Sequence, residues 1–423
     1  MKKNPFTIGK PVPPEGFVGR TAEIQAAFDQ IYNRSHLAIW GGSGMGKSSF
    51  LAQLASPQVW EQYGYDPSEA ALILLSCEYI RPFTASRFWE EVLRLIKDNL
   101  DGESGLQAEI ESLLNNGQST KESLRQVLRG LGKKQKSLVL LVDDYDAALR
   151  ENAQYTEADM LAFVSDCRNL AYHTQESRYL SMIVASLKRL SELGPKLNPG
   201  ASPWYNHYLF VSLKPFSEEE VDRFLLGIPM TFQLREAIQE ITGRHPYLLQ
   251  IAGSLLYREL RTGKVSDAQA FARDFESTTR QFFQLIWKRS SELEQTLMML
   301  MALLNLKGRL QQARFDLSGI ELIFTQRERE LINLEEQGVV VRSLQAGKPV
   351  YSFTSSIMER WVIQEIWNTD DPSLRERQKV FLNLLSSEQV KKLTAFTSWV
   401  SQHKDEILGT IEWFGRMSTI FPV

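Results

Sequence analysis

The chain has 423 residues, 43% of them hydrophobic and 23% charged, a balance typical of globular proteins with about two to four domains. This composition excludes disordered, collagen-like and fibrous chains. The 48 basic and 51 acidic residues give a formal net charge of −3, so no global positive field attracts nucleic acid or anionic lipid. Any contact with nucleic acid is therefore expected to be local.

The cysteines and the N-terminal residues indicate the cellular compartment in which the protein is expected. Cys77 and Cys167 lie in apolar surroundings, and with only five histidines the chain is expected to have neither a disulfide framework nor a zinc cluster. The N-terminal Met-Lys-Lys-Asn-Pro-Phe lacks an apolar region, and the longest apolar run, Leu297 to Leu304, is far below the ~20 residues that span a bilayer. We expect a cytoplasmic protein without a membrane segment.

The first 215 residues alternate between short apolar runs and amphipathic segments. Residues 1–16 are rich in Pro and Gly and predict an extended arm, and a helix is expected over Thr21 to Tyr32 with Thr21 as its N-cap. Apolar strands separated by helices indicate a parallel sheet covered on both faces. The expected strands are 36–40, 71–77, 138–142, 180–185 and 208–213, and the helices between them include 85–100, 121–131 and 158–170.

The hydrophobic pattern after Pro215 predicts almost only helices, and the order and length of the predicted elements change near Ser290. Three helices followed by two short strands are the order of a winged-helix domain. From Asp370 onward the chain is expected to be helical and amphipathic. The expected helices are 218–227, 232–242, 247–260, 267–288, 293–306, 318–324, 327–336 and 356–367; the strands are 339–343 and 349–354; the tail carries Trp399, Trp413 and Phe414.

The strongest motif is Gly41-Gly-Ser-Gly-Met-Gly46-Lys47-Ser48, which fits the phosphate-loop pattern G-x-x-x-x-G-K-[ST] between a predicted strand and a predicted helix. The glycines let successive backbone N–H groups point at phosphate oxygens at the positive end of a helix. Lys47 is expected to reach the β- and γ-phosphates, and the Ser48 hydroxyl to ligate Mg²⁺. The motif predicts nucleoside triphosphate binding.

A second acidic signal follows the apolar strand at 138–142. Asp143 is expected to hold Mg²⁺ and its water shell, and Asp144 to orient the attacking water. Because Asp is one methylene shorter than Glu, slow hydrolysis is the natural expectation. The alternative is that Asp143, Asp144 and Asp146 merely cap the strand.

A sensor of the γ-phosphate could sit one strand later. Ser186 and Arg189 are the candidates, although a turn serine and a solvated arginine explain these positions equally well. Arg168 and Arg178 are further candidates that the sequence does not rank.

Three further segments, together with the phosphate loop and the acidic pair, occur in an order that resembles STAND-type NTPases, the AAA+-related signalling ATPases of bacteria and archaea. Phe17-Val-Gly-Arg20 resembles the N-terminal motif of that family, and Thr242-Gly243-Arg-His-Pro246 resembles its lid motif. Leu213-Lys-Pro215, leading into Ser-Glu-Glu-Glu-Val221, is similar to the family's step from the last strand into the lid. The resemblance implies an extended arm at 1–16, an α/β P-loop NTPase core of the AAA+/STAND type at 17–215, a helical lid at 216–289, a winged helix at 290–368 and a helical tail at 369–423.

The resemblance also implies that ATP or ADP with Mg²⁺ lies between the Phe17 to Arg20 segment, the phosphate loop and the lid. Gly19 could instead serve only a left-handed turn, and Pro246 only a helix start. The implied nucleotide-binding residues are Phe17, Val18, Gly19, Arg20, Gly41, Gly42, Ser43, Gly44, Met45, Gly46, Lys47, Ser48, Ser49 and Pro246.

Three readings of the function remain open. The helix expected at Thr325 to Gln337 carries more glutamates than arginines, which favours protein packing over DNA recognition. The favoured interpretation is a slowly hydrolysing regulatory switch, in bacterial signalling or defence, that controls a separate effector or sensor protein or its own oligomer. The alternative is a DNA-acting AAA+ ATPase of the initiator or transposition-regulator kind. A third reading is a pseudo-ATPase that keeps nucleotide as a structural element.

Overall fold

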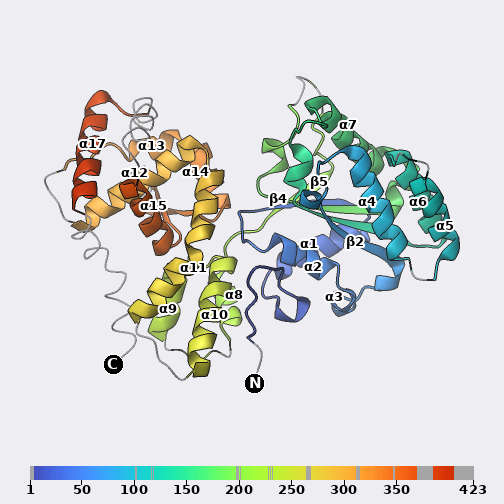
Figure 1. The fold of residues 1–423 in the computed structure, drawn as a ribbon, viewed down its shortest axis with the longest axis horizontal. Helices are drawn as coiled ribbons and strands as arrows, with labels where there is room; N and C mark the ends of the chain where they lie inside the picture. The colour runs from blue at the N-terminus through green and yellow to red at the C-terminus, as the bar shows by residue number, and fades with distance from the viewer. Residues whose placement is uncertain are drawn as a thin grey trace. The chain divides into compact units, whose positions relative to one another are not determined.

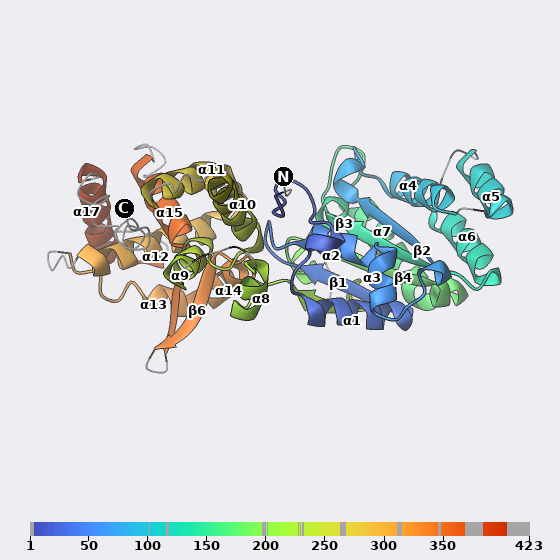
Figure 2. The ribbon, with the colours of Figure 1, turned by 90° about the horizontal axis from the view of Figure 1, so that it is seen from below.

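The structure, a computed structural model, is shown in two views in Figures 1 and 2. It divides into two compact units, which we call the core unit (Gly9–Gly42 and Gly46–Leu213) and the helical unit (Met1–Ile8, Ser43–Met45 and Lys214–Val423). It describes residues 4–100, 102–115, 117, 119–196, 200, 202–226, 228, 230, 232–262, 268–310, 315–345, 348–368 and 384–403.

A five-stranded sheet of order β2-β3-β4-β1-β5 forms the centre of the core unit, and every neighbouring pair is parallel. β4 is buried along its whole length and β3 along all but its last residue, which explains their continuous apolar sequences. β2 and β5 are the edges. The strands are β1 (His36–Trp40), β2 (Ala70–Ser76), β3 (Ser137–Asp143), β4 (Leu180–Ser186) and β5 (Tyr208–Ser212). The predicted parallel α/β fold is confirmed.

Helices cover both faces of this sheet, with α1 and α4 on opposite sides (Figure 2). α4 is strongly amphipathic and buries Phe88, Trp89, Val92, Leu93 and Ile96. The α-helices are α1 (Thr21–Tyr32), α2 (Lys47–Leu54), α3 (Pro57–Gln62), α4 (Ala85–Asp98), α5 (Ser104–Asn115), α6 (Lys121–Lys133) and α7 (Glu157–Arg168). Short 3-10 turns are η1 (Pro14–Gly16), η2 (Pro67–Glu69), η3 (Cys77–Tyr79), η4 (Tyr145–Leu149), η6 (Gln175–Tyr179) and η7 (Leu190–Glu192), and η5 (Asn169–His173) is a π-helical turn.

Both cysteines lie in the hydrophobic core of this unit. Cys77 and Cys167 are free thiols with almost no exposed surface. Burial in apolar surroundings raises the pKa of each thiol above its ordinary value. Both are therefore packing residues.

The helical unit has one continuous hydrophobic core, which extends from Phe216 to Val400. Gly243, in the turn before α10, has φ +57°, and a Cβ there would lie 2.5 Å from the Thr354 carbonyl oxygen, so this close approach requires glycine. The elements are α8 (Glu218–Phe224), α9 (Phe232–Thr242), α10 (Pro246–Thr262), α11 (Ala268–Arg289), α12 (Glu292–Leu310), α13 (Leu322–Gln326), α14 (Glu328–Glu336), the antiparallel strands β6 (Val340–Gln345) and β7 (Lys348–Phe353), α15 (Ser356–Asn368) and α17 (Ser387–Gln402).

The N-terminal arm begins in the helical unit. The Phe6 ring packs on Phe224 of α8, with ring centroids 5.4 Å apart, and the Thr7 amide donates to Gln250 Oε1 of α10 at 2.8 Å. A Cβ on Gly253 would lie 2.3 Å from Phe6, so α10 accepts this ring only because residue 253 has no side chain. From Gly9 onward the arm belongs to the core unit, where the Val12 amide donates to Ser49 Oγ of α2 at 2.9 Å.

Some sequence expectations need correction. Thr21 is not the N-cap of α1: Arg20 is, with a left-handed φ of 60° and without a side-chain cap. Gly19 also has positive φ (+76°), so two left-handed residues turn the chain into the helix. Helix α5 was not expected, and the helix expected at 318–324 is displaced to α13. Trp399 lies in α17, whereas Trp413 and Phe414 lie outside the described residues.

Candidate functional site

The phosphate loop connects β1 to α2 at the carboxyl edge of the sheet. The Gly41 amide donates to the Ser186 carbonyl at 3.3 Å, which fixes the start of the loop beside β4. Gly44 and Gly46 have φ of +78° and +91°, conformations that side-chain-bearing residues rarely adopt. The Lys47 ammonium donates to the carbonyls of Gly41 (2.6 Å) and Gly42 (3.0 Å), so it curls back over the loop.

This geometry suits a phosphate chain. The loop ends at the first turn of α2, where unpaired backbone N–H groups and the helix dipole favour an anion. Lys47 can exchange its two carbonyl acceptors for phosphate oxygens, which are stronger acceptors because they are charged. The loop therefore offers backbone N–H groups and one mobile ammonium to the same ligand.

The acidic pair lies at the end of β3. Asp143 pairs in register with Ser76 of β2, and burial raises the pKa of its carboxyl while a hydrogen bond from Ser48 opposes the rise. Asp144 takes a left-handed φ of 48°, and its Oδ2 accepts a hydrogen bond of 2.7 Å from Ser76 Oγ. The two carboxylates thus meet different partners, as two different roles require.

The residues present fit a magnesium ion. Ser48 and Asp143 offer a hydroxyl and a carboxylate oxygen, the hard ligands that Mg²⁺ prefers. Among the described residues, no group of three or more His, Cys, Asp or Glu side chains forms a metal cluster. An ion held here therefore needs phosphate and water oxygens as further ligands, the usual arrangement for Mg²⁺ with a nucleotide.

The segment from Phe17 to Arg20 leads into α1, which packs on β1 and α2. Phe17 and Val18 are half-buried, and Arg20 is buried with an ion pair of 3.4 Å to Glu23. Pro246 is the first residue of α10 in the helical unit, a position where its missing N–H costs nothing. Nucleotide contacts of these residues stay predictions.

The predicted sensors have other contacts. Ser186 lies beside the loop, but its hydroxyl donates to the Lys188 carbonyl at 2.7 Å. The Arg189 guanidinium stands over the Trp40 ring, 5.2 Å from its centroid, and Arg168 bonds to Ser202. Asp146 is more than a strand cap: it is buried, and its two carboxylate oxygens share the N–H of Leu187 (3.1 and 2.9 Å), which holds the chain just after β4.

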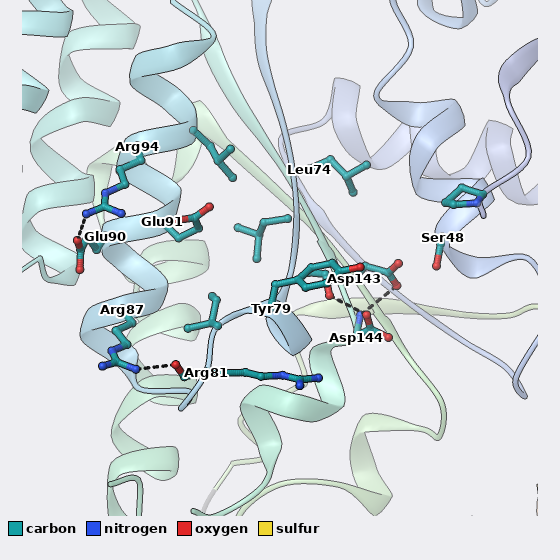
Figure 3. Close-up of a pocket in the computed structure, with 15 residues that line it drawn as sticks. Ser48, Leu74, Tyr79, Arg81, Arg87, Glu90, Glu91, Arg94, Asp143 and Asp144 are labelled. Carbon is teal, nitrogen blue, oxygen red and sulfur yellow. Dashed lines mark hydrogen bonds and ion pairs between the residues drawn. The ribbon is translucent and has the colours of Figure 1, made fainter. Parts of the chain in front are cut away.

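A cleft of ≈ 790 Å³ adjoins the acidic pair (Figure 3). Ser48, Asp143 and Asp144 line one side, and the end of β2 and helix α4 line the other. It also exposes Tyr79 and Arg81, which sequence reasoning missed. No motif marks these residues, because β2 becomes a neighbour of β3 only in the folded sheet.

A parallel sheet of this order, with a phosphate loop after β1 and an acidic pair after β3, defines the P-loop AAA+ fold. The match of residues 16–180 to the family described as AAA ATPase domain agrees with this assignment. Residues 16–180 are thus similar to an AAA ATPase domain, and this part of the chain has a P-loop ATPase fold. Within the described residues, no helix has both the length and the apolar character needed to cross a membrane.

Solved structures with this fold cover most of the chain. A Walker-type ATPase of Pyrococcus abyssi is similar over 85% of this chain and 99% of its own, with a TM-score of 0.52 and 14% identity. The Aeropyrum pernix ORC2 protein, in complexes with ADPNP and ADP, is similar over 86% and 98%, with a TM-score of 0.51 and 12% identity. No curated protein is similar enough to count as a match. At these identities the likeness concerns the fold alone.

Proposed function

We propose that the protein is a STAND-type regulatory switch that binds ATP with Mg²⁺, hydrolyses it slowly and controls a partner protein or its own assembly. Slow hydrolysis is expected because the water-orienting residue is Asp144, shorter than a glutamate, and because Ser76 already occupies one of its oxygens. A slow rate suits a switch, because each bound ATP then keeps the protein in its ATP-bound conformation long enough for a partner to bind.

The N-terminal arm is the observation that carries this proposal. Its first part is anchored on α8 and α10 of the helical unit, and its second part on Ser49 of α2. Ser49 directly follows Ser48, so a nucleotide that orders the first turn of α2 acts on a residue that holds the arm. The chain passes between the units at Ile8–Gly9 and Leu213–Lys214, and also within the phosphate loop, at Gly42–Ser43 and Met45–Gly46.

We assign the lid to helices α8–α11 and a winged helix to α12–α15 with the hairpin β6–β7. The acidic α14 and the wing favour a protein partner: Glu328 of α14 pairs with Arg342 of β6 at 3.2 Å, which neutralises a cation of the wing. A DNA-binding helix needs unneutralised cations toward the phosphates. A separate effector or sensor protein, or a second copy of this chain, is the proposed partner.

Hydrogen exchange with and without MgATP tests the proposal. A ligand that binds only one arrangement stabilises it by about 2.7 kcal/mol at a hundredfold excess over Kd. We expect a higher melting temperature and slower amide exchange in α10, in α12 and in the arm at residues 4–8. Protection limited to residues 41–49 would contradict the switch.

A gel shift at several salt concentrations separates the switch from the DNA-acting ATPase. Phosphate contacts give a steep loss of affinity with salt, so a salt-sensitive shift of duplex DNA would favour the alternative. Persistent ADP with no turnover would instead indicate a pseudo-ATPase.

A further inference from the structure

The cleft of Figure 3 continues from the place where a γ-phosphate would lie. A triphosphate on the loop directs its last phosphate toward the residues that hold Mg²⁺, here Ser48 and Asp143, and both line the cleft. Asp144 lines it too. Lys47 and a bound Mg²⁺ would offset the repulsion between a phosphate and the carboxylates of Asp143 and Asp144, and a further cation on this side of the cleft would strengthen binding of the third phosphate.

Among the described residues that line the cleft, the cationic side chains are Arg81, Arg87 and Arg94. Arg94 forms an ion pair with Glu90 on α4. Arg87 donates to the carbonyls of Arg81 (2.9 Å) and Pro82 (3.1 Å), and so holds the chain between η3 and α4. In Figure 3 the Arg87 and Arg94 side chains stay on the α4 side, whereas the Arg81 side chain extends toward the end that holds Asp143 and Asp144.

A chain of hydrogen bonds connects Asp144 to Arg81. Ser76 Oγ donates to Asp144 Oδ2 (2.7 Å) and accepts from the Glu78 amide (3.2 Å). Arg81 in turn donates from Nη2 to Glu78 Oε1 (2.6 Å) and from Nε to the Glu78 carbonyl (2.8 Å). These bonds link the Arg81 guanidinium through Glu78 and Ser76 to Asp144, while the Arg81 side chain as a whole is 72% exposed.

The partner of Arg81 can be exchanged at little cost. Glu78 is 45% exposed and three residues away, and exposed pairs of this kind contribute only about 0–1 kcal/mol. A phosphate accepts the guanidinium through two parallel hydrogen bonds and carries more charge than one carboxylate. A γ-phosphate should therefore compete successfully with Glu78 for this side chain.

We propose that Arg81 binds the γ-phosphate from the β2 side of the site and thereby distinguishes ATP from ADP. The proposal depends on ATP binding at the phosphate loop and not on the switch. It places the sensor of the third phosphate at the end of β2, two strands away from the end of β4, where Ser186 and Arg189 lie.

Titration calorimetry of Arg81→Ala with MgADP and with a non-hydrolysable triphosphate tests this role. We expect the triphosphate affinity to fall about 10- to 100-fold, the loss typical of a charge-assisted hydrogen bond, and the ADP affinity to change less than about twofold. Arg94→Ala is the matched control, because it removes the same charge from the same cleft and should change both affinities less than about twofold.

Two further variants test the mechanism. Arg81→Lys keeps the charge without the planar fork and should recover only part of the preference, and Glu78→Gln removes the competing carboxylate and should raise the triphosphate affinity. Equal losses for both nucleotides in Arg81→Ala, or equal effects of Arg81→Ala and Arg94→Ala, would overturn the assignment. Suppose that Arg81→Ala loses the preference for triphosphate over ADP while MgATP fails to slow amide exchange in α10 of the wild-type protein. That result would contradict the regulatory switch but support Arg81 as the γ-phosphate sensor.

Discussion

The hydroxyl of Ser76, at the end of β2, donates a 2.7 Å hydrogen bond to Oδ2 of Asp144, at the end of β3. Ser76 is paired in register with Asp143, so one residue of the edge strand lies beside both members of the acidic pair. The bond holds the Asp144 side chain while its backbone keeps a left-handed φ of 48°. The geometry of the predicted water-orienting group therefore depends on a strand 68 residues earlier in the chain.

Lys47→Ala should abolish tight nucleotide binding, because it removes the ammonium that can leave the Gly41 and Gly42 carbonyls for the phosphates. Calorimetric titration with MgATP measures the loss. The melting temperature without nucleotide should stay unchanged, since Lys47 lies at the first position of α2 and not in a core. Lys133→Ala, at an exposed position of α6, is the control and should bind normally. Wild-type affinity in Lys47→Ala would refute the assigned role.

Asp144→Asn should keep MgATP bound but stop turnover, because the amide has a similar shape and cannot act as a base toward water. Asp143→Asn should instead weaken the dependence of binding on Mg²⁺, because it removes the proposed metal ligand. Steady-state hydrolysis and binding at several Mg²⁺ concentrations separate the two, with exposed Asp98→Asn as the control. Identical behaviour of the two variants would show that the acids do not divide these roles.

Gly253→Ala should release the arm from the helical unit. The new Cβ would lie 2.3 Å from Phe6, so the ring must leave its place against Phe224. Gly308→Ala in α12 is the matched control: its Cβ meets open space, and the change should stabilise the helix by about 0.5–1 kcal/mol. Amide exchange at Thr7 is the readout. Unchanged protection of that amide in Gly253→Ala would contradict the packing described here.

Stability should fall as the pH decreases from 6.5 to 4. Burial lowers the pKa of His36 to about 4, although a hydrogen bond to the Ala171 carbonyl opposes the shift. Burial and the neighbouring His36 lower the pKa of His207 to about 3. Because the unfolded chain binds protons from about pH 6.5, it gains protons in this range while the folded chain does not. For His36 alone the loss reaches about 3 kcal/mol.

Urea unfolding at pH 7, 5.5 and 4.5 measures this effect, and His36→Gln should flatten the dependence. Glu176 titrates in a different range: burial alone would raise its pKa, but hydrogen bonds from Arg129 and Arg125 hold it at about 2. Its contribution is therefore lost only below about pH 4.5. A wild-type stability that is constant between pH 6.5 and 4.5 would show that the histidines are not neutral in the fold.

The sequence predicted those elements whose local residue pattern agrees with their burial in the folded sheet. β1, the phosphate loop and β3 combine continuous apolar strands with glycines and acids at fixed spacing. Thr21 was misassigned because a good capping residue does not show that the preceding two residues turn left-handed. Helix α5 was missed although Leu106, Ile110, Leu113 and Leu114 have helical spacing; of its residues, only Leu106 and Ile110 are buried.

The site residues that belong to sequence motifs were predictable, whereas those brought to the site by strand pairing were not. Lys47, Ser48, Asp143 and Asp144 belong to motifs, whereas Ser76 and Arg81 carry no local signal and matter only because β2 lies next to β3. The candidate sensors Ser186 and Arg189 were predicted because they lie at and just after the end of the next strand along the chain. Their hydroxyl and guanidinium groups contact Lys188 and Trp40, contacts that no sequence pattern specifies.

The burial of both thiols makes the native chain suitable for site-specific labelling. Cys77 and Cys167 are the protein's two cysteines, and neither offers an accessible thiolate to a maleimide dye. Tyr79 lines the cleft and is 87% exposed, so Tyr79→Cys would place a single reactive sulfur there without removal of the native pair. A fluorophore at that position would report nucleotide arrival in real time from a background that needs no further mutation.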